Sequence, residues 1–395
     1  MQCIGLQYEL TGFKEEYRNA IHHMLTSQTK KDGFLVQAMV IFAIILHAQN
    51  QQQAARQLLN SAIDLALDLG MNRNAFASAH GANSHLLEES WRRTWWELYV
   101  LDGMLAALHH QTSFKLHDVD NDVPLPCEEP EYSLGTVTSA RTSTLDQFKN
   151  RVFTNDTSGS SFAYRIEAIR ILGTILPLDL SPYTQDSIAI EAAEATLTSW
   201  HLSLPPSKRD ILDSGGKIDE MLFQAYMIIN SATIYLHHPL SPSTSPPQLQ
   251  PSIPCTTPTL TPTTAPPTSS TTPNPHQHKT LHAASAISRL ISLPFPTNRP
   301  FTAHTPFFIC SIALSTMVHV AACSIPSATS QSEHARGNVV LGLGALGRLG
   351  EVWKIAEVIL GEVRGVAREV VGVGKGRGGE GGIFEGIDWG GEIGG

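Results

Sequence analysis

Apolar residues recur at helical spacing through almost the whole chain. A clear example runs from Ile190 to Leu204, where successive apolar residues are separated by steps of 3, 4, 3 and 4 before Pro205 ends the pattern. Residues at these spacings lie on one side of an α-helix, whereas a half-buried strand alternates every second residue. The sequence contains no sustained alternation of that kind. The pattern therefore predicts an all-α protein, with about ten helices packed as a helical array.

Two segments lack the helical pattern. Residues 239–275 hold half of the chain's 24 prolines among serines and threonines, and residues 372–395 are rich in glycine. Such segments bury too little apolar surface to offset the entropy lost on ordering. The predicted organisation is a first helical part (1–238), a disordered Pro/Ser/Thr-rich insertion (239–278), a second helical part (279–371) and a disordered Gly-rich tail (372–395).

The longest apolar repeat runs from Leu346 to Val370 at strict 3–4 spacing, which predicts one long helix. A dimeric coiled coil and a helix buried against its own domain are both open at this point. Additional apolar residues, including Val352 and Ile359, widen the stripe beyond a narrow coiled-coil seam. The pattern favours a core helix over a dimer zipper.

Charge and cysteine content argue against several kinds of site. The chain of 395 residues has 27 Lys and Arg against 36 Asp and Glu, a net charge of −9, and no basic block. It therefore has little electrostatic means of binding DNA or RNA unaided. None of its five cysteines form the C-x₂-C pairs typical of zinc sites, so we expect no metal ligands and no cofactor in this chain.

Two apolar stretches, residues 33–48 and 307–325, resemble membrane spans. The first is shorter than a bilayer requires and the second contains several serines, a threonine and a histidine. We expect both to be buried core helices, and no association with a membrane.

Residues 342–347 (GLGALG) match the spacing of a dinucleotide-binding loop. That mechanism needs a strand before the glycines and a second strand after the helix, and no strand pattern follows here. The alternative interpretation is that small residues mark a close helix crossing.

Residues 118–129 have the acidic spacing of an EF-hand calcium loop. Val123 stands where the loop needs glycine, and prolines follow it, so an acidic loop after a helix is favoured. No HExxH, GxSxG or phosphate-loop motif occurs, and we expect no catalytic residues and no enzyme.

The most specific segment is residues 88–102, EESWRRTWWELYVLD. Glu88 with Arg92 and Glu89 with Arg93 are i,i+4 pairs in the favourable orientation. Trp95 shares a helix face with Asp102, so we expect Trp95 to be buried and Asp102 to need a buried partner. We expect Arg93 to lie on an exposed face.

This segment resembles the middle homology region of fungal binuclear zinc-cluster transcription factors, also found in xylan-utilisation activators. The resemblance extends to AIDLALDLG before it, to DVDNDVPLP after it, and to residues 220–239 and 340–370. Departures are Gly103, where the family usually has Arg, and residues 110–112 (HQT), which replace Gly-Arg-Pro. The family signature, with a structural or regulatory role, comprises Arg92, Arg93, Trp95, Trp96, Tyr99, Asp102, Asp120, Pro124 and Pro126.

The resemblance implies a nuclear regulatory domain that controls transcription by RNA polymerase II. It places zinc and DNA binding in an N-terminal cluster of six cysteines, which would lie upstream of Met1 and not in these residues. Expected partners are a second copy or another zinc-cluster factor, transcriptional cofactors and a small-molecule effector. Two alternatives are open: a partner that does not bind DNA but dimerises with an intact factor, and an α-helical ligand-binding protein or enzyme with a pocket near the face of Trp91, Trp95 and Asp102.

Overall fold

The computed structural model describes residues 15–27, 30–137, 143–150, 159–180, 187–213, 215–241, 274–295, 300–323 and 329–374. Within these ranges the regular structure is helical, apart from one isolated antiparallel bridge between Leu212 and Ile218. The all-α prediction is confirmed. The helices are α2 (Glu15–Ser27), α3 (Gly33–Ala48), α4 (Gln52–Asp68), α5 (Asn74–His80), α6 (His85–Leu108), α7 (Glu129–Ser133), α8 (Leu145–Lys149), α10 (Ser161–Ile175), α11 (Ser187–Leu202), α12 (Pro206–Arg209), α13 (Glu220–His237), α14 (Pro275–Ile291), the 3₁₀ helix η2 (Phe301–Ala303), α15 (Phe308–Cys323), α16 (Thr329–Gly350) and α17 (Lys354–Gly374).

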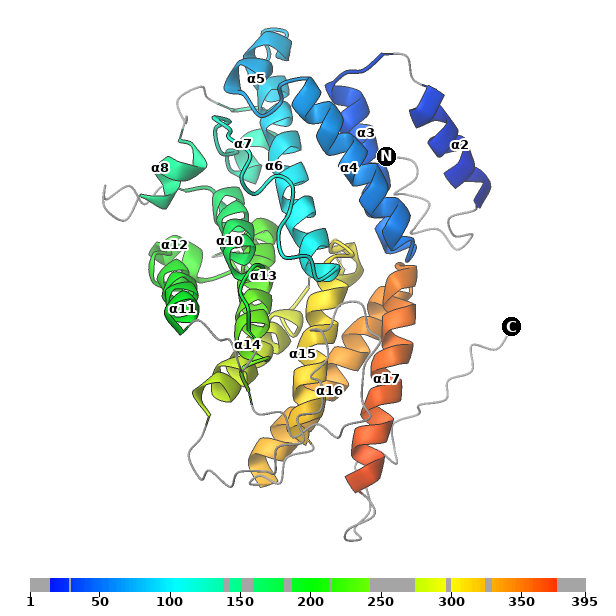
Figure 1. Cartoon of the computed structure of the whole chain (residues 1–395), viewed down its shortest axis with the longest axis vertical. Helices are drawn as coiled ribbons and strands as arrows, with labels where there is room; N and C mark the ends of the chain where they lie inside the picture. The colour runs from blue at the N-terminus through cyan, green and yellow to red at the C-terminus, as the bar shows by residue number, and fades with distance from the viewer. Residues whose placement is uncertain are drawn as a thin grey trace.

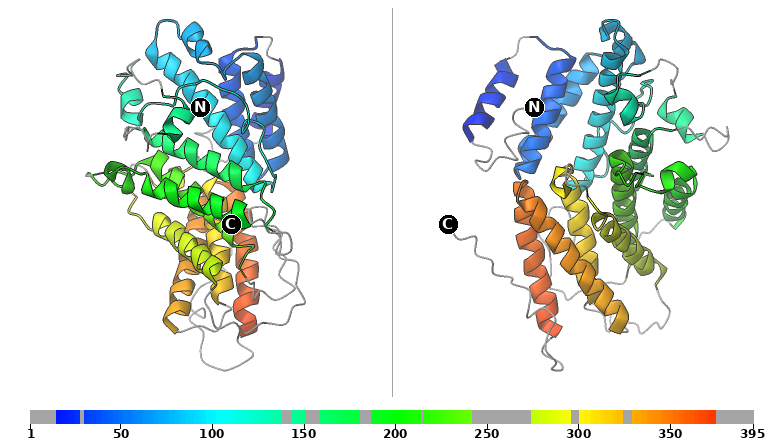
Figure 2. Two further views of the ribbon diagram at one scale, coloured as in Figure 1. Left: turned by 60° about the vertical axis from the view of Figure 1, so that its left-hand side comes forward. Right: turned by 180° about the vertical axis from the view of Figure 1, so that it is seen from behind.

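The helices form an array with α13 near its centre. Helices α3 to α6 lie at one end of the molecule and α15 to α17 at the other, with α10, α11, α13 and α14 between them (Figure 1). Helix α13 packs against α10 on one side and against α14 and α15 on the other. Helix α17 also contacts α3, so elements from both ends of the sequence meet (Figure 2).

Side-chain caps fix where several helices begin. Asp32, Ser84, Ser160 and Asp219 each stand immediately before a helix and accept a hydrogen bond from a backbone N–H of its first turn. These bonds satisfy donors that have no partner within the helix. Gly70 follows α4 with a φ of +75°, the left-handed conformation expected of a glycine that ends a helix.

The apolar repeat from Leu346 to Val370 forms two helices, so the prediction of one helix is wrong. Helix α16 ends at Gly350, and the N–H groups of Val352 and Trp353 donate to the carbonyl of Leu349 to close its last turn. Helix α17 then begins at Lys354 and packs with α16 against α15. The repeat does not reveal the turn, because the buried positions keep their spacing through it. Burial against its own domain, favoured over a zipper, is confirmed by the packing of both helices.

Two predicted boundaries need correction. Helix α14 begins at Pro275, inside the range 239–278 given to the insertion, because proline in the first turn gives up no helical hydrogen bond. Helix α17 extends to Gly374, three residues into the predicted tail, since each glycine costs a helix only about 1 kcal/mol. Residues 242–273 and 375–395 lie outside the described residues.

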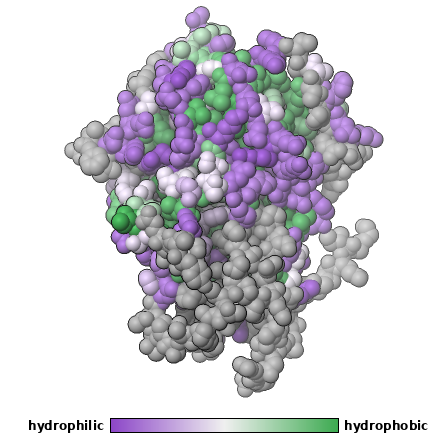
Figure 3. All heavy atoms as spheres, in the orientation of Figure 1, coloured by the Kyte–Doolittle hydropathy of each residue, from purple (hydrophilic) through white to green (hydrophobic). Residues whose placement is uncertain are grey.

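Among the helices that the structure describes, none is both long and apolar enough to cross a bilayer. The two apolar stretches form α3 and α15, and both helices contribute buried side chains to the core. On the face drawn in Figure 3 the described surface is mostly hydrophilic, with apolar side chains visible in separate patches.

Candidate functional site

The family signature is centred on α6, where Glu89 is almost fully buried between two arginines. Its carboxylate accepts from Arg92 Nε at 3.0 Å, from Arg93 Nε at 3.1 Å and from the backbone N–H of Cys127 at 2.9 Å. Arg92 also pairs with Glu88 at 3.9 Å. Both predicted i,i+4 pairs therefore form, and they hold the segment around Cys127 against α6.

Arg93 is largely buried, so its predicted place on an exposed face is wrong. Its side chain is 14% exposed, and its guanidinium lies over the rings of Tyr132 and Phe162 at 4.0 and 4.3 Å. It also donates to Glu129 at 2.6 Å and to the carbonyl of Cys127 at 3.2 Å. The sequence pattern of α6 could not show this, because the two covering rings come from α7 and α10.

Asp102 has the buried partner that its position required. Its carboxylate accepts from Arg56 at 2.8 Å and from the backbone N–H of Leu116 at 2.9 Å. Burial raises the pKa of Asp102, and the two donors oppose that rise. Arg56 lies on α4. The cation that pairs with Asp102 therefore comes from a neighbouring helix, and not from the residue that follows Asp102 in the sequence. Gly103 fills that position, and a Cβ there would approach Ile169 of α10 to 2.6 Å.

The remaining signature residues join α6 to the acidic segment. Trp95, Trp96 and Tyr99 are at most 2% exposed. The indole N–H of Trp96 donates to the carbonyl of Pro124 at 2.9 Å.

Three further contacts hold the acidic segment itself. The carbonyl of Pro126 accepts from Ser160 at 2.6 Å, while exposed Asp120 pairs with Arg73 at 2.8 Å. The Asp122 carboxylate caps the N-terminus of α5 by accepting from Asn74 N. The signature therefore lies in the core and its supporting loop.

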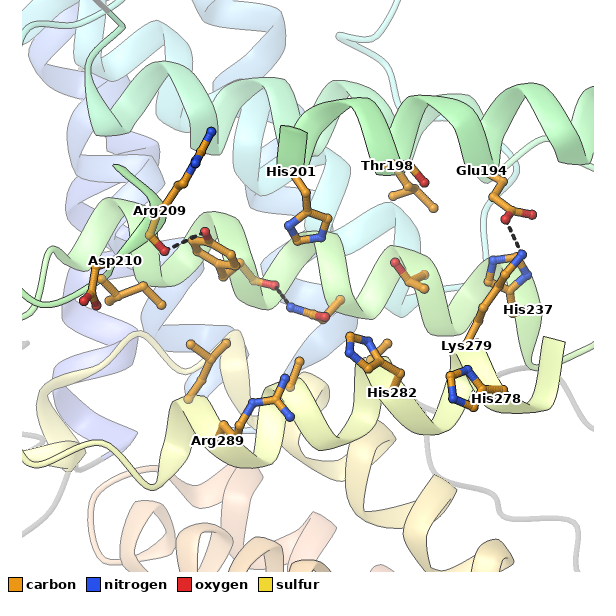
Figure 4. A pocket seen from close by; sticks show the side chains of 18 of the residues that line it. Glu194, Thr198, His201, Arg209, Asp210, His237, His278, Lys279, His282 and Arg289 are labelled. Carbon is orange, nitrogen blue, oxygen red and sulfur yellow. Dashed lines mark hydrogen bonds and ion pairs between the residues drawn. The ribbon is translucent and has the colours of Figure 1, made fainter. Parts of the chain in front are cut away.

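A groove of about 580 Å³ lies elsewhere, between α11, α13 and α14 (Figure 4). Helices α11 and α14 form its walls, α13 lies behind them as its floor, and residues 209–211 lie at one end. None of the nine signature residues lines this groove. Its apolar lining includes Leu197, Ile211 and Leu290, all of them buried.

Polar contacts tie the groove's walls together at one end. Glu194 of α11 forms an ion pair with Lys279 of α14. Behind them, Nδ1 of His237 and Nδ1 of His276 are 3.0 Å apart, so one ring donates and the other accepts. Burial lowers the pKa of His237 to about 4, which keeps this ring neutral at pH 7.

Two more histidines point into the groove from opposite walls, His201 from α11 and His282 from α14 (Figure 4). Burial, together with the neighbouring His282, lowers the pKa of His201. The His201 ring lies 5.8 Å from the ring of Tyr226, whose hydroxyl donates to the carbonyl of Arg209. The middle of the groove is thus lined by the rings of His201, His282 and Tyr226.

Sequence reasoning missed these groove residues. His278, His282 and Arg289 are spaced by four and seven residues, which puts them on one face of α14. That face was the available signal. The helices that form the groove with α14, α11 and α13, lie before residues 242–273 in the chain. The spacing of residues on one helix does not identify the helices that pack against it.

Metal and dinucleotide chemistry find no support in the described part of the chain. It contains no group of three or more His, Cys, Asp or Glu side chains placed to hold a metal ion. Gly342 lies within α16, where a Cβ would come within 2.0 Å of Thr316 Oγ1 on α15. The interpretation of a close helix crossing is confirmed at Gly342.

Comparison with known proteins agrees with this architecture. Residues 9–203 match the fungal specific transcription factor domain. Over 355 residues the chain is 39% identical to the C6 finger domain transcription factor iacK of Pestalotiopsis fici. The chain carries a fungal specific transcription factor domain. This domain and this relative support a role in regulating transcription, and the family is one of transcription factors and not of enzymes.

The matched region of the fungal transcription factor domain includes the whole signature and α11, whereas α13 to α17 follow it. The alignment with the relative covers 90% of this chain and 51% of that protein, so the chain spans about half the length of the curated relative it matches. No solved structure matches the chain.

Proposed function

We propose that this chain is the regulatory part of a nuclear transcription factor that controls transcription by RNA polymerase II. The observation that carries the proposal is the fungal transcription factor domain over residues 9–203, joined to 39% identity with a transcription factor along most of the chain. The net charge of −9 supports a regulatory role over direct contact with DNA. Zinc and DNA binding would belong to another part of such a protein.

The proposal predicts that the chain changes transcription when it is brought to a promoter. The 395-residue chain would be fused to an unrelated DNA-binding domain in a fungal host carrying the matching reporter gene. We expect the reporter transcript to differ from that given by the DNA-binding domain alone. An unchanged transcript, with the fusion present in the nucleus at equal abundance, would refute the proposal.

A further inference from the structure

The groove between α11, α13 and α14 has the size and lining of a small-molecule site. Its volume of about 580 Å³ falls within the range of roughly 300–1,000 Å³ typical of ligand pockets. Leu197, Ile211 and Leu290 present apolar surface along it, and Ala283 and Ala286 leave space beside α14. An apolar body could bury its surface there.

Charge in the groove is divided unevenly. At one end Glu194 and Lys279 neutralise each other. Towards the other end Arg289 of α14 extends its guanidinium into the groove (Figure 4), and among the described residues that guanidinium has no hydrogen-bond or ion-pair partner. Of the two other charged groups there, Arg209 donates to the carbonyl of Leu204 and Asp210 accepts from the N–H of Leu212. Neither bond neutralises these two side chains, but Figure 4 shows the Arg209 guanidinium directed away from the groove, so Arg289 is the arginine that faces a ligand there.

We propose that this groove binds a small amphipathic carboxylate, with its carboxylate on Arg289 and its apolar body along the α11 and α14 walls. A planar guanidinium can hold a carboxylate through two parallel hydrogen bonds. A single arginine suits one carboxylate better than a phosphate, which recruits several cationic or backbone donors. The imidazole rings of His201 and His282 also face the groove and offer N–H groups as further hydrogen-bond donors.

Ligand binding in the groove does not depend on the proposed function, but the interpretation of the groove as an effector site rests on that function. Helix α11 ends the matched transcription factor domain, while α13 and α14 follow that match. A ligand in the groove would therefore contact both parts. Direct binding to the purified chain tests the site, whereas the reporter assay tests the regulatory role, so failure of one is distinguishable from failure of the other.

The experiment compares carboxylates with neutral molecules of the same shape. Hexanoate, decanoate and 4-phenylbutyrate, each paired with its primary amide, would be titrated into the full chain at pH 7.5 and followed by ligand-observed NMR. We expect at least one carboxylate to bind about 10-fold more tightly than its amide, as a charged hydrogen-bonded pair provides. Equal affinity, or no binding, for all three pairs would overturn the proposal.

Three variants locate the binding. Arg289→Gln should remove the preference for the carboxylate and leave the weaker binding of the amide. Ala286→Trp should fill the groove and reduce both affinities. Arg348→Gln, in an exposed residue of α16 that pairs with Glu351, is the matched control and should change neither. Circular dichroism would verify that each variant is folded. Carboxylate preference that survives Arg289→Gln, or binding that survives Ala286→Trp, would place the ligand elsewhere and refute the proposal.

Discussion

Arg93 is largely buried, although the helical pattern of its sequence predicted an exposed position. Two aromatic rings cover its guanidinium, and Glu89 and Glu129 pair with it. Its role is to join α6 to the segment that follows Pro126 and to the start of α10. A buried cation with several partners is expensive to remove, because the partners are left without compensation.

We expect Arg93→Ala to lower the free energy of unfolding by about 2–4 kcal/mol. Glu89 would keep Arg92 as a partner, which limits the loss. Arg348→Ala, whose side chain is 68% exposed, should stay within about 0.5 kcal/mol of the wild type. Urea denaturation followed by circular dichroism measures both, and equal effects would show that the cover over Arg93 contributes little.

Trp95 is fully buried, in agreement with the sequence pattern. Replacing it with alanine removes a large side chain from the core, and we expect a loss of roughly 3–5 kcal/mol. The same urea titration provides the measurement. A loss below that of Arg93→Ala would mean that the core beside Trp95 closes over the space.

Buried His47 makes the stability of the fold depend on pH. Burial is the main cause that lowers its pKa to about 3, and neither ring nitrogen has a hydrogen-bond partner among the described residues. The unfolded chain therefore binds a proton at higher pH than the folded chain does. Below about pH 6.5, the ordinary pKa of histidine, the stability contributed by neutral His47 is lost progressively as the pH falls toward 3. His237 and His319, with pKa values lowered to about 4 by burial, act in the same direction.

We expect His47→Leu to reduce the slope of unfolding free energy against pH between 6 and 4 by up to about 1.4 kcal/mol per pH unit. The leucine keeps an apolar contact with Phe307, whose ring stacks on His47 at 4.3 Å. Thermal melts across this pH range provide the measurement. An unchanged slope would show that His47 is not held neutral by its surroundings.

At the scale of elements, α15 and α16 approach each other closely where Gly342 meets Thr316. The Thr316 hydroxyl cannot rotate away without losing its bond to the carbonyl of Ile312 at 2.7 Å. Gly344 lies two residues later on the same helix, with open space where a Cβ would project. Replacing each glycine with alanine therefore compares a position at the helix crossing with a nearby position that has open space.

We expect Gly342→Ala to destabilise the protein by about 1–3 kcal/mol through overpacking. Gly344→Ala should stabilise it by roughly 0.5–1 kcal/mol, because alanine loses less backbone freedom on forming a helix. Differential scanning calorimetry would measure the two shifts in melting temperature. Shifts of the same sign would mean that the crossing is looser than the structure has it.

Elements with a regular apolar face and a clear end could be predicted from the sequence. Helix α4 ends at Asp68, just before Gly70 in its left-handed conformation, and the buried face of α11 holds Ile190, Leu197 and Trp200. The turn at residues 351–353 could not be predicted, because the apolar spacing continues through it. The groove could not be predicted from the sequence either, because its walls come from helices on either side of residues 242–273. Local spacing reports which face is buried, and the partner that covers it is set by tertiary packing.

At the scale of the whole molecule, one core cluster of buried apolar residues extends from Val36 to Ala367. Helix α13 connects the two ends, because one side packs on α10 and the other on α14 and α15. Helices beyond the matched domain are therefore part of the same core. A cut after α13 would expose the side of that helix that faces α14 and α15.

We expect a single cooperative unfolding transition for the full chain, with coincident curves from far-UV circular dichroism and tryptophan fluorescence. A fragment of residues 1–241 should lack that transition, since it cannot cover α13. Two separated transitions in the full chain, or a fragment that melts cooperatively alone, would show that the halves are independent units.

The contact between His237 and His276 brings the end of α13 and the start of α14 to one place. A chain that leaves and returns at the same point makes that junction suitable for protein engineering. Lengthening a closed loop costs only about 0.6 kcal/mol for each doubling. A fluorescent protein grafted between residues 255 and 260 would thus be tolerated by the core. Because His237 also lines the groove, a graft that joins the ends of these two helices could serve as an optical reporter of their separation.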